Sequence, residues 1–415
     1  MKSGTDTTDP ETPKELPGEF VVELPGAMRL AVVIESFNPA AGGNERSTQQ
    51  IIQELATRGH DVTLITGCCQ VENEPEGVTT LAMTRTKSSS AFRLRRFAKW
   101  ARQQLAEGGF DASLSMTMAV PASVVPPRGG TIRETLARNV AMRGGGLARL
   151  KKKIEINLDP KQQLLLALEK KTLADPAVYR VAALSRYVVE QLEQHYAFPE
   201  ARTVVIPNAA VMPETNEAQK QAWRAEIRGR YDVPDDAVLY LFAAQNPKLK
   251  GYPTLLGALA QLKDRGIHAI ALLAGGFDAN GDPAAESAGV ADRVRVVGPT
   301  KDMPPLFAAA DVTVLPSWYD PSRKVVLESL MMGAPAISTT FNGASAPLRP
   351  LNGPPRGRVI DDPGDAQKLA DAMAELADPD VRAACAAACD GLADQLSMAR
   401  HVDRLEQVLA EAAGR

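Results

Sequence analysis

Short runs of apolar, largely β-branched residues alternate with amphipathic segments along the first part of the chain. The run 29–34 is followed by a glycine-bearing loop and by a segment, 47–58, whose apolar residues recur at helical spacing. A second apolar run, 61–66, comes directly after the Gly59-His60 pair that ends this segment. Such runs are typical of buried parallel strands, and the order strand, loop, helix, strand is the building block of a doubly wound sheet.

The same alternation continues to residue 208 and begins again in the second half of the chain. In the first half, further strands are expected at 112–116 and 181–185, and a helix is expected at 186–196. In the second half, buried strands are expected at 237–243, 269–274, 294–298, 312–316, 336–339 and 357–360. Helices such as 252–265 lie between these runs, which predicts a second parallel sheet with helices on both faces.

Chain length is consistent with this division. A chain of 415 residues exceeds one typical core, so two α/β domains are expected. Residues 1–26 are rich in Thr, Pro, Glu and Asp and lack the basic start and apolar core of a signal peptide, so we expect a disordered or loosely attached tail. Residues 27–208 are predicted to form the first Rossmann-like domain and residues 209–390 the second.

Composition and charge narrow the classes of function. The formal net charge of −3 argues against a protein coated with positive charge, so no nucleic-acid partner is expected. No apolar run approaches the ~20 residues that span a bilayer, which favours a cytoplasmic protein. The cysteines, Cys68, Cys69, Cys385 and Cys389, have no further metal ligands nearby, so we expect buried thiols and no metal site.

Two basic stretches raise the question of a membrane surface. Between Phe92 and Arg102, one helical stripe with basic residues on its flanks is formed by the side chains of Phe92, Phe97, Trp100 and Ala101. The stretch 147–153 adds further lysines. Such helices lie on anionic membrane surfaces, but ordinary domain helices with a solvated basic side have the same pattern. The sequence leaves both readings open.

The segment 316–328 carries the most informative chemistry. It joins the end of an expected strand to the start of an expected helix, and its carboxylates Asp320 and Glu328 stand eight residues apart. Backbone N–H groups at a helix N-terminus bind anions and hydroxyl-rich ligands. Glu328 falls two turns into the helix, near enough to the ligand to hold a diol such as ribose. The plain alternative is a pair of solvated carboxylates that cap the helix.

This segment resembles the E-x7-E signature of retaining glycosyltransferases of family 4, which have the GT-B fold. That fold consists of two Rossmann-like domains that face each other across a cleft. In the family, the helix after the signature ends in Gly-x-Pro, as Gly333-Ala334-Pro335 does here. The sequence departs from the pattern at Asp320, where the family usually has Glu, and at Lys324, where the residue is usually apolar.

Further elements of the family follow in the expected order from residue 28 onward. Gly42-Gly43 resembles the loop that lets the backbone approach the donor diphosphate, although a plain tight turn has the same sequence. In the stretch 246–251, Lys250 resembles the lysine that neutralises the diphosphate leaving group, with Lys248 as a helper; the alternative is an exposed lysine in a turn. The resemblance gives catalytic roles to Asp320, Lys250 and Glu328. It gives donor binding to Gly42, Gly43, Asn246, Lys248, Lys250, Ser322, Arg323, Lys324, Val325 and Glu328.

Among the branches of the family, the lipopolysaccharide-core glucosyltransferases are the most similar. The features shared with them are Asn246 with the two lysines after it, and the segment 128–134. This branch implies UDP-glucose as the donor and a glycan or glycolipid acceptor, with the enzyme peripheral on the inner face of the membrane. Residues 128–134 form either an acceptor-site loop or a charged surface loop.

The resemblance implies transfer of a hexose to an acceptor hydroxyl with retention, without a metal or cofactor. It also implies that the last helix, 391–415, returns to the N-terminal acceptor domain. A non-catalytic relative that binds sugar nucleotides is one rival reading, left open by Asp320. An NAD-dependent oxidoreductase is another, although no Gly-x-Gly-x-x-Gly opens either domain. No histidine is assigned a catalytic role: His60 is expected to be structural, and no acidic partner is placed beside His195 or His268.

Overall fold

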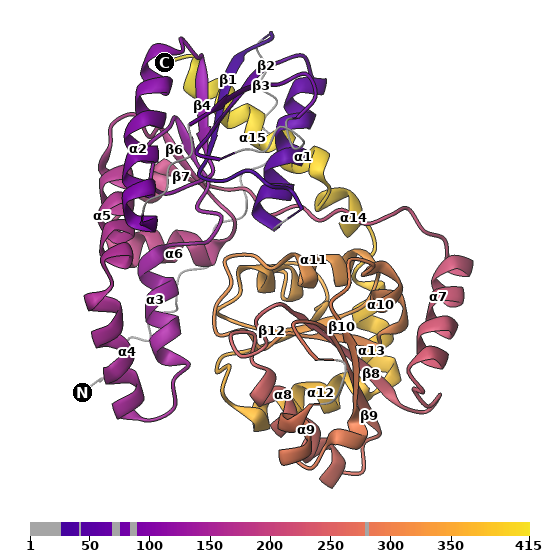
Figure 1. The fold of residues 1–415 in the computed structure, drawn as a ribbon. Coiled ribbons are helices and arrows are strands. Elements are labelled where there is room, and N and C mark those ends of the chain that lie inside the picture. Colours follow the sequence, from indigo (N-terminus) through magenta and orange to yellow (C-terminus); the bar gives the residue numbers. More distant parts are fainter. Residues whose placement is uncertain (1–25, 41–42, 69–74, 84–88, 279–281) are drawn as a thin grey trace, which may run out of the picture.

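The computed structural model describes residues 26–40, 43–68, 75–83, 89–278 and 282–415. Gly42, Cys69 and nearly all of the expected N-terminal tail lie outside the described residues. Two parallel sheets stand one above the other in separate lobes (Figure 1). Each sheet is flanked by helices, so the predicted architecture of two Rossmann-like α/β domains is confirmed.

The N-terminal sheet has seven strands in the order β3-β2-β1-β4-β5-β6-β7. They are β1 (Arg29–Ile34), β2 (Asp61–Thr66), β3 (Thr79–Ala82), β4 (Ala112–Ser115), β5 (Val124–Val125), β6 (Arg180–Ala183) and β7 (Thr203–Val205). The helices of this lobe are α1 (Gly43–Thr57), α2 (Ser90–Glu107), α3 (Ile132–Ala141), α4 (Gly146–Leu158), α5 (Pro160–Ala174) and α6 (Arg186–Tyr196).

The C-terminal sheet has six strands in the order β10-β9-β8-β11-β12-β13. They are β8 (Val238–Ala244), β9 (Ala269–Gly275), β10 (Val294–Gly298), β11 (Val312–Val314), β12 (Ala336–Thr339) and β13 (Gly357–Ile360). The helices from here to the chain end are α7 (Glu217–Arg230), α8 (Tyr252–Asp264), α9 (Pro283–Ser287), α10 (Pro304–Ala309), α11 (Lys324–Met331), α12 (Ala366–Ala377), α13 (Pro379–Ala387), α14 (Leu392–Gln395) and α15 (Met398–Ala413).

Strand β1 shows why an apolar run becomes the centre of a sheet. Its successive side chains point to opposite faces, and both faces are covered. Leu30 and Val32 join the core formed with α1 and α15, whereas Ala31 and Val33 join the core formed with α2. A strand buried on both sides needs apolar residues at every position, which is the pattern read from the sequence.

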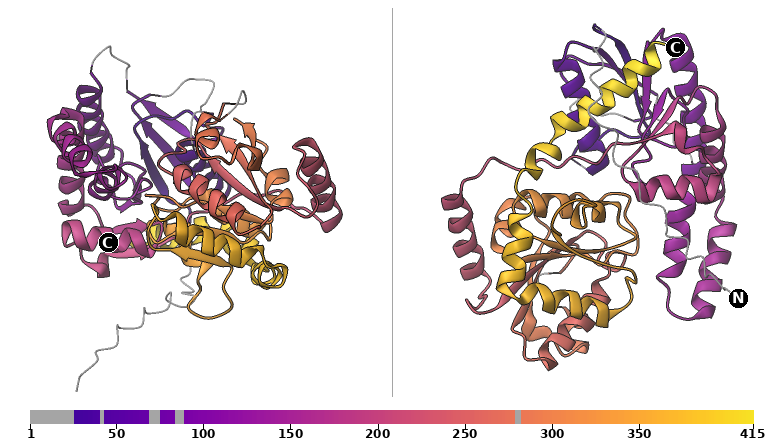
Figure 2. Two further views of the ribbon diagram at one scale, coloured as in Figure 1. Left: turned by 90° about the horizontal axis from the view of Figure 1, so that it is seen from below. Right: turned by 180° about the vertical axis from the view of Figure 1, so that it is seen from behind.

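The last helix, α15, crosses from the C-terminal lobe to the N-terminal sheet (Figures 1 and 2). Its Leu405 and Leu409 pack in the core under β1. Glu406 fixes this position: its carboxylate lies 2.9 Å from His60 Nε2 and accepts a 2.7 Å hydrogen bond from the Arg58 guanidinium. The two lobes are therefore linked at a second place besides the segment between β7 and α7.

Helix α2 carries the first of the two basic stretches. Phe97 and Ala101, two residues of the stripe that was considered for a membrane surface, are buried against β1. Trp100 is half-buried against the same core, and only Phe92 is exposed. The region from Phe92 to Arg102 is thus a domain helix whose apolar side faces the core. No helix among the described residues has the length and apolarity needed to cross a bilayer.

The cysteines of the second pair are both buried. Cys385 lies on α13 and Cys389 follows it, and both side chains pack in the core of the C-terminal lobe. Among the described residues, no group of three or more His, Cys, Asp and Glu side chains is arranged to hold a metal ion.

Candidate functional site

The candidate site lies where loops at the carboxyl ends of the strands of both sheets meet. The C-terminal lobe contributes the loop 245–251 after β8 and the loop 315–323 after β11. The N-terminal lobe contributes the loop 126–131 after β5 and residues that follow β6 and β7. Ligands of open α/β sheets bind at the carboxyl ends of the strands, so this is where a ligand is expected.

Lys250 and Asp320, both predicted to be catalytic, form a buried ion pair. The Lys250 ammonium donates to Asp320 Oδ2 at 2.6 Å and to the Tyr319 carbonyl at 2.8 Å. Asp320 Oδ1 accepts a hydrogen bond from the Ser322 amide. Burial lowers the pKa of Lys250, and the nearby Asp320 carboxylate acts against that shift. Lys250 is only 5% exposed, which rules out an exposed lysine in a turn.

A glycine shapes the loop that carries this lysine. Gly251 has a φ of 81°, and a Cβ placed there would lie 2.1 Å from the Pro316 carbonyl oxygen. Only glycine therefore allows the loop after β8 to pack against the loop after β11. This close approach brings Lys250 onto Asp320.

Glu328 differs from Asp320 because its carboxylate is free. It stands half-buried on α11, and it has no hydrogen bond or ion pair with any other described residue. Burial raises the pKa of Glu328, while the charges of Lys324, Arg323 and Arg46 act to lower it. Burial likewise lowers the pKa of Lys324 to about 8, with the neighbouring Arg128 acting in the same direction.

Replacing Glu328 by a neutral residue should raise the stability of the protein near neutral pH. Because the folded-state pKa of Glu328 is raised above the ordinary value of 4.5, ionisation of this carboxylate lowers the stability as the pH rises through that folded-state value. Glu328→Gln should therefore unfold at a higher temperature than the wild type near neutral pH, with no difference well below pH 4.5. Thermal unfolding of both proteins across this range checks the prediction. A variant destabilised at neutral pH would contradict it.

Arg128 belongs to the candidate acceptor-site loop 128–134 and was not among the residues predicted to bind the donor. It follows β5, and its Nη2 donates to Asn208 Oδ1 at 3.1 Å, while its Nη1 is buried without a partner. No carboxylate of a described residue pairs with this guanidinium, and burial lowers its pKa to about 10. A buried cation without a counter-ion is costly, so an anion at this position would complete the site.

Direct hydrogen bonds hold the two lobes together around this site. Ser185 Oγ donates to the Pro321 carbonyl at 2.8 Å, and the Asn208 side chain donates to the Ser322 carbonyl at 3.1 Å. The Tyr319 hydroxyl donates to the Gly129 carbonyl at 2.9 Å. The loop 319–322 is therefore fixed by residues of both lobes.

These contacts also bear on whether residues 128–134 form an acceptor-site loop or a charged surface loop. Thr131 and Glu134 are buried, and Gly129 contacts Tyr319 of the other lobe, so the segment is not a charged surface loop. Glu134 accepts hydrogen bonds from Tyr187 and Arg138 and lies 2.7 Å from His195 Nε2. These bonds lower the pKa of Glu134 against the effect of burial, which alone would raise it.

Two histidines therefore have acidic partners that the sequence did not show. His195 pairs with Glu134, and His268 Nδ1 lies 2.9 Å from Asp236 Oδ2. The His268 pair is exposed and far from the cleft loops in the fold, at the amino end of β8 and β9. His60 has the structural role expected of it, in the contact with α15.

The other predicted donor-binding residues lie around the same loops. Lys248 is exposed in the loop after β8, and Asn246 accepts a hydrogen bond from the Leu249 amide in that loop. Arg323 has a buried Nε without a partner and faces the site with Lys324. Ser322 is buried, and Val325 packs partly against the core. Gly43 is the first residue of α1, and Gly42 is not among the described residues.

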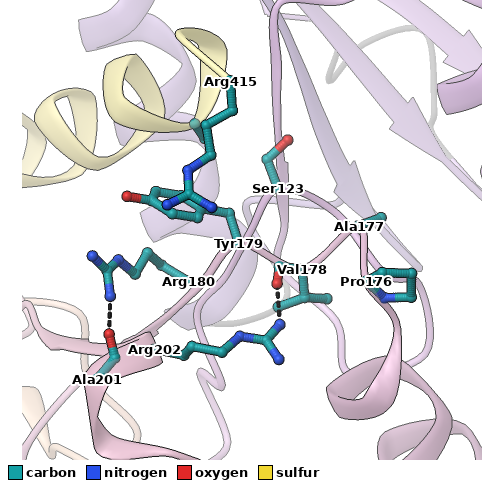
Figure 3. A pocket seen from close by; sticks show the side chains of 10 residues that line it. Ser123, Pro176, Ala177, Val178, Tyr179, Arg180, Ala201, Arg202 and Arg415 are labelled. Carbon is teal, nitrogen blue, oxygen red and sulfur yellow. Dashed lines mark hydrogen bonds between the residues drawn. The ribbon is translucent and has the colours of Figure 1, made fainter.

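A separate hollow of ≈ 590 Å³ lies elsewhere in the N-terminal lobe (Figure 3). It is lined by Tyr179, Arg180 and Arg202 at the amino ends of β6 and β7, and by Arg415 after α15. Arg180 and Arg202 donate to the carbonyls of Ala201 and Val178. The hollow lies at the amino ends of these strands, whereas the site loops lie at the carboxyl ends, so the hollow is not part of the site.

Comparison with known proteins gives two family matches. Residues 41–210 match the model described as Glycosyltransferase Family 4, and residues 236–379 match the model described as Glycosyl transferases group 1. The first match covers the loops of the N-terminal lobe, and the second includes Lys250, Asp320 and Glu328.

Curated relatives match parts of the chain. The lipopolysaccharide core biosynthesis glycosyltransferase LpsE of Rhizobium meliloti is 33% identical over 149 residues, which are 36% of this chain and 42% of that protein. The D-inositol 3-phosphate glycosyltransferase of Thermobispora bispora is 29% identical over 270 residues, 61% of this chain and 60% of that protein. The chain thus spans about half the length of these relatives.

Solved structures resemble the whole fold. WaaG, a glycosyltransferase involved in lipopolysaccharide biosynthesis, superposes with a TM-score of 0.69 at 20% identity, covering 92% of this chain and 99% of WaaG. Anabaena Alr3699/HepE in complex with UDP-glucose gives a TM-score of 0.65 at 17% identity, covering 92% of this chain and 100% of that one. These likenesses confirm the GT-B architecture expected from the sequence.

Proposed function

Because the chain combines a Glycosyltransferase Family 4 domain with a Glycosyl transferases group 1 domain in the GT-B fold, we propose that it transfers a hexose from a nucleotide diphosphate donor to an acceptor hydroxyl. The observation that carries this proposal is the Glu328 carboxylate beside Lys324, with Arg128 next to that lysine; none of the three has an ion-pair partner among the described residues. A carboxylate suits the hydroxyls of a ribose, and guanidinium and ammonium groups suit a diphosphate.

The proposed chemistry depends on charge at the leaving group. Breaking the bond between the anomeric carbon and the diphosphate oxygen builds negative charge on that oxygen. Positive groups fixed at this position stabilise the transition state. Arg128 and Lys324 supply two such groups, and the N-terminus of α11, the positive end of the helix dipole, adds further positive potential. The proposal requires neither a metal ion nor a cofactor.

Both residues of the buried pair Lys250–Asp320 have hydrogen-bonding positions left for the donor. An ammonium has three donor hydrogens, and two of those on Lys250 go to Asp320 and Tyr319, which leaves one for the diphosphate. The Asp320 carboxylate has about four acceptor positions, and its contacts with Lys250 and the Ser322 amide leave room for a sugar hydroxyl. We assign both residues to the donor sugar end of the site.

The finer identity of the substrates follows from the family resemblance and the relatives. We propose UDP-glucose as the donor, supported by the fold shared with the HepE complex, and a glycan or glycolipid as the acceptor, supported by the similarity to LpsE. The E-x7-E resemblance supports retention of the anomeric configuration. The N-terminal lobe is assigned to the acceptor, except for Arg128, which is assigned to the donor diphosphate.

A turnover assay tests the proposal. The protein is incubated with UDP-, GDP- and ADP-sugars and a panel of glycan and glycolipid acceptors, and release of nucleoside diphosphate and the anomeric configuration of the product are measured. We expect acceptor-dependent release from one donor. Glu328→Gln should reduce it about 10- to 100-fold, the loss expected when hydrogen bonds to a charged acceptor are removed.

The rival readings give different results in the same assay. Saturable binding of one nucleotide sugar without turnover on any acceptor would indicate a non-catalytic binding protein. Binding of NAD without binding of any nucleotide sugar would favour an oxidoreductase. Release that Glu328→Gln leaves unchanged would contradict the proposed site.

A further inference from the structure

Tyr319 reaches from the C-terminal lobe into the N-terminal lobe. It stands directly before Asp320 and is only 5% exposed. The backbone on either side of it is fixed within its own lobe. The Trp318 amide donates to the Leu249 carbonyl at 3.0 Å, after β8. The Asp320 amide donates to the Phe341 carbonyl at 2.9 Å, after β12. The Tyr319 side chain therefore extends from a loop that is held firmly by the C-terminal lobe.

The hydroxyl end of this side chain lies among residues of the N-terminal lobe. It donates to the Gly129 carbonyl at 2.9 Å and lies 3.3 Å from Gln191 Oε1. Gly130 has a φ of 69°, and a Cβ placed there would lie 1.8 Å from the hydroxyl oxygen, so glycine makes room for the hydroxyl. The ring packs edge-on against Tyr187 of α6, with the ring centroids 6.2 Å apart. Burial raises the pKa of Tyr319, so the phenol keeps its proton and acts as the donor.

The carbonyl that accepts this hydrogen bond belongs to the residue after Arg128, the cation assigned to the donor diphosphate. The Arg128 guanidinium donates to Asn208 at 3.1 Å, and the Asn208 side chain donates to the Ser322 carbonyl at 3.1 Å. The main chain beside Arg128 is held by the Tyr319 hydroxyl. Both the guanidinium and the main chain of this arginine are thus tied to the loop 319–322 of the other lobe, which leads into α11.

We propose that Tyr319 is a positioning residue for the transfer reaction: its hydroxyl holds the peptide after Arg128, so that the guanidinium of the N-terminal lobe meets the diphosphate at the start of α11. This inference rests on the proposed function. A cation stabilises a transition state most when its position is fixed before the reaction. A hydrogen bond from the C-terminal lobe to the loop that carries Arg128 fixes it in this way.

Tyr319→Phe removes the hydroxyl and keeps the ring and its contact with Tyr187. The matched control is Tyr240→Phe, because the buried Tyr240 hydroxyl also donates to a backbone carbonyl, that of Met373 at 2.7 Å, but within the C-terminal lobe. Both variants should lose similar amounts of stability in thermal unfolding. In calorimetric titration with UDP, only Tyr319→Phe should bind more weakly, by about 3- to 10-fold, the ratio that corresponds to one hydrogen bond.

A second background shows whether the hydroxyl acts through Arg128. In Arg128→Met, adding Tyr319→Phe should lower the affinity for UDP no further, because the group that the hydroxyl positions is already absent. The same fall on both backgrounds would overturn the proposal, since a general loosening of the fold acts independently of the arginine. So would a Tyr319→Phe protein that binds UDP as tightly as Tyr240→Phe does.

Hydrogen exchange without any ligand tests the contact separately from the activity. The amides of Arg128 and Gly130 are bonded within their own loop, to the carbonyls of Pro126 and Pro127. They should exchange about 3- to 10-fold faster in Tyr319→Phe and at the wild-type rate in Tyr240→Phe. Unchanged exchange in Tyr319→Phe would overturn the proposal. A wild type that binds no UDP would contradict the proposed function and this role together, whereas wild-type binding that Tyr319→Phe retains in full would overturn this role alone.

Discussion

Lys250→Ala is expected to lower the free energy of unfolding by about 3–5 kcal/mol, the typical cost of removing one partner of a buried ion pair. The substitution leaves the Asp320 carboxylate buried with only the Ser322 amide as a partner. It also frees the loop after β8 from the Tyr319 carbonyl. Denaturant unfolding of the purified protein measures the change.

Two further variants show whether the pair itself is responsible. Lys248→Ala makes the same change in the same loop at an exposed position, so its unfolding should stay within about 0.5 kcal/mol of the wild type. Combining Lys250→Met with Asp320→Leu removes both charges and should recover most of the lost stability without recovering turnover. If Lys250→Ala unfolds like Lys248→Ala, the buried pair does not stabilise the fold.

Arg128→Met is expected to preserve the stability of the fold and to weaken nucleotide binding. The variant keeps most of the side-chain volume and removes a buried cation with which no carboxylate of the described residues pairs, so the fold should be at least as stable as the wild type. Its affinity for a nucleotide diphosphate should fall about 10- to 100-fold, because the charge-assisted hydrogen bonds to the phosphates are lost. Calorimetric titration with UDP and thermal unfolding measure the two effects.

Arg133→Met provides the comparison for this variant. Arg133 lies five positions further along, at the start of α3, and is exposed. Its replacement should change neither stability nor nucleotide affinity appreciably. An Arg128→Met protein that binds UDP as tightly as the wild type would show that the buried guanidinium serves another purpose than holding the diphosphate.

The strand pattern could be predicted from the sequence because burial on both faces demands apolar residues at every strand position. The runs at 29–34 and 61–66 correspond to β1 and β2 residue for residue. The two-residue strand β5 and the half-exposed edge strand β3 escaped notice, because neither has a long apolar run. Helix α1 begins at Gly43 rather than at residue 47, since glycine gave no helical signal.

Candidate site residues could be predicted where residues close in sequence carry the chemistry, but not where the fold brings distant residues together. Asp320 and Glu328 were proposed from their spacing on one loop and helix. The partners of Lys250 and His195, 70 and 61 positions away, depend on how the strands are ordered. The two interpretations of the Phe92 stripe stayed open for a related reason: helical periodicity shows that a helix has an apolar face, but not whether a sheet covers it.

A thermal-shift titration with nucleotides tests the central claim, that a nucleotide diphosphate sugar binds between the two lobes. The wild type is titrated with UDP-glucose, with GDP- and ADP-sugars, and with NAD, beside Glu328→Gln and Arg128→Met. A ligand that binds only the folded state raises the unfolding temperature in proportion to its affinity. The account predicts a saturable rise with one nucleotide sugar that both variants largely lose. No rise with any nucleotide sugar, together with a rise with NAD, would contradict it.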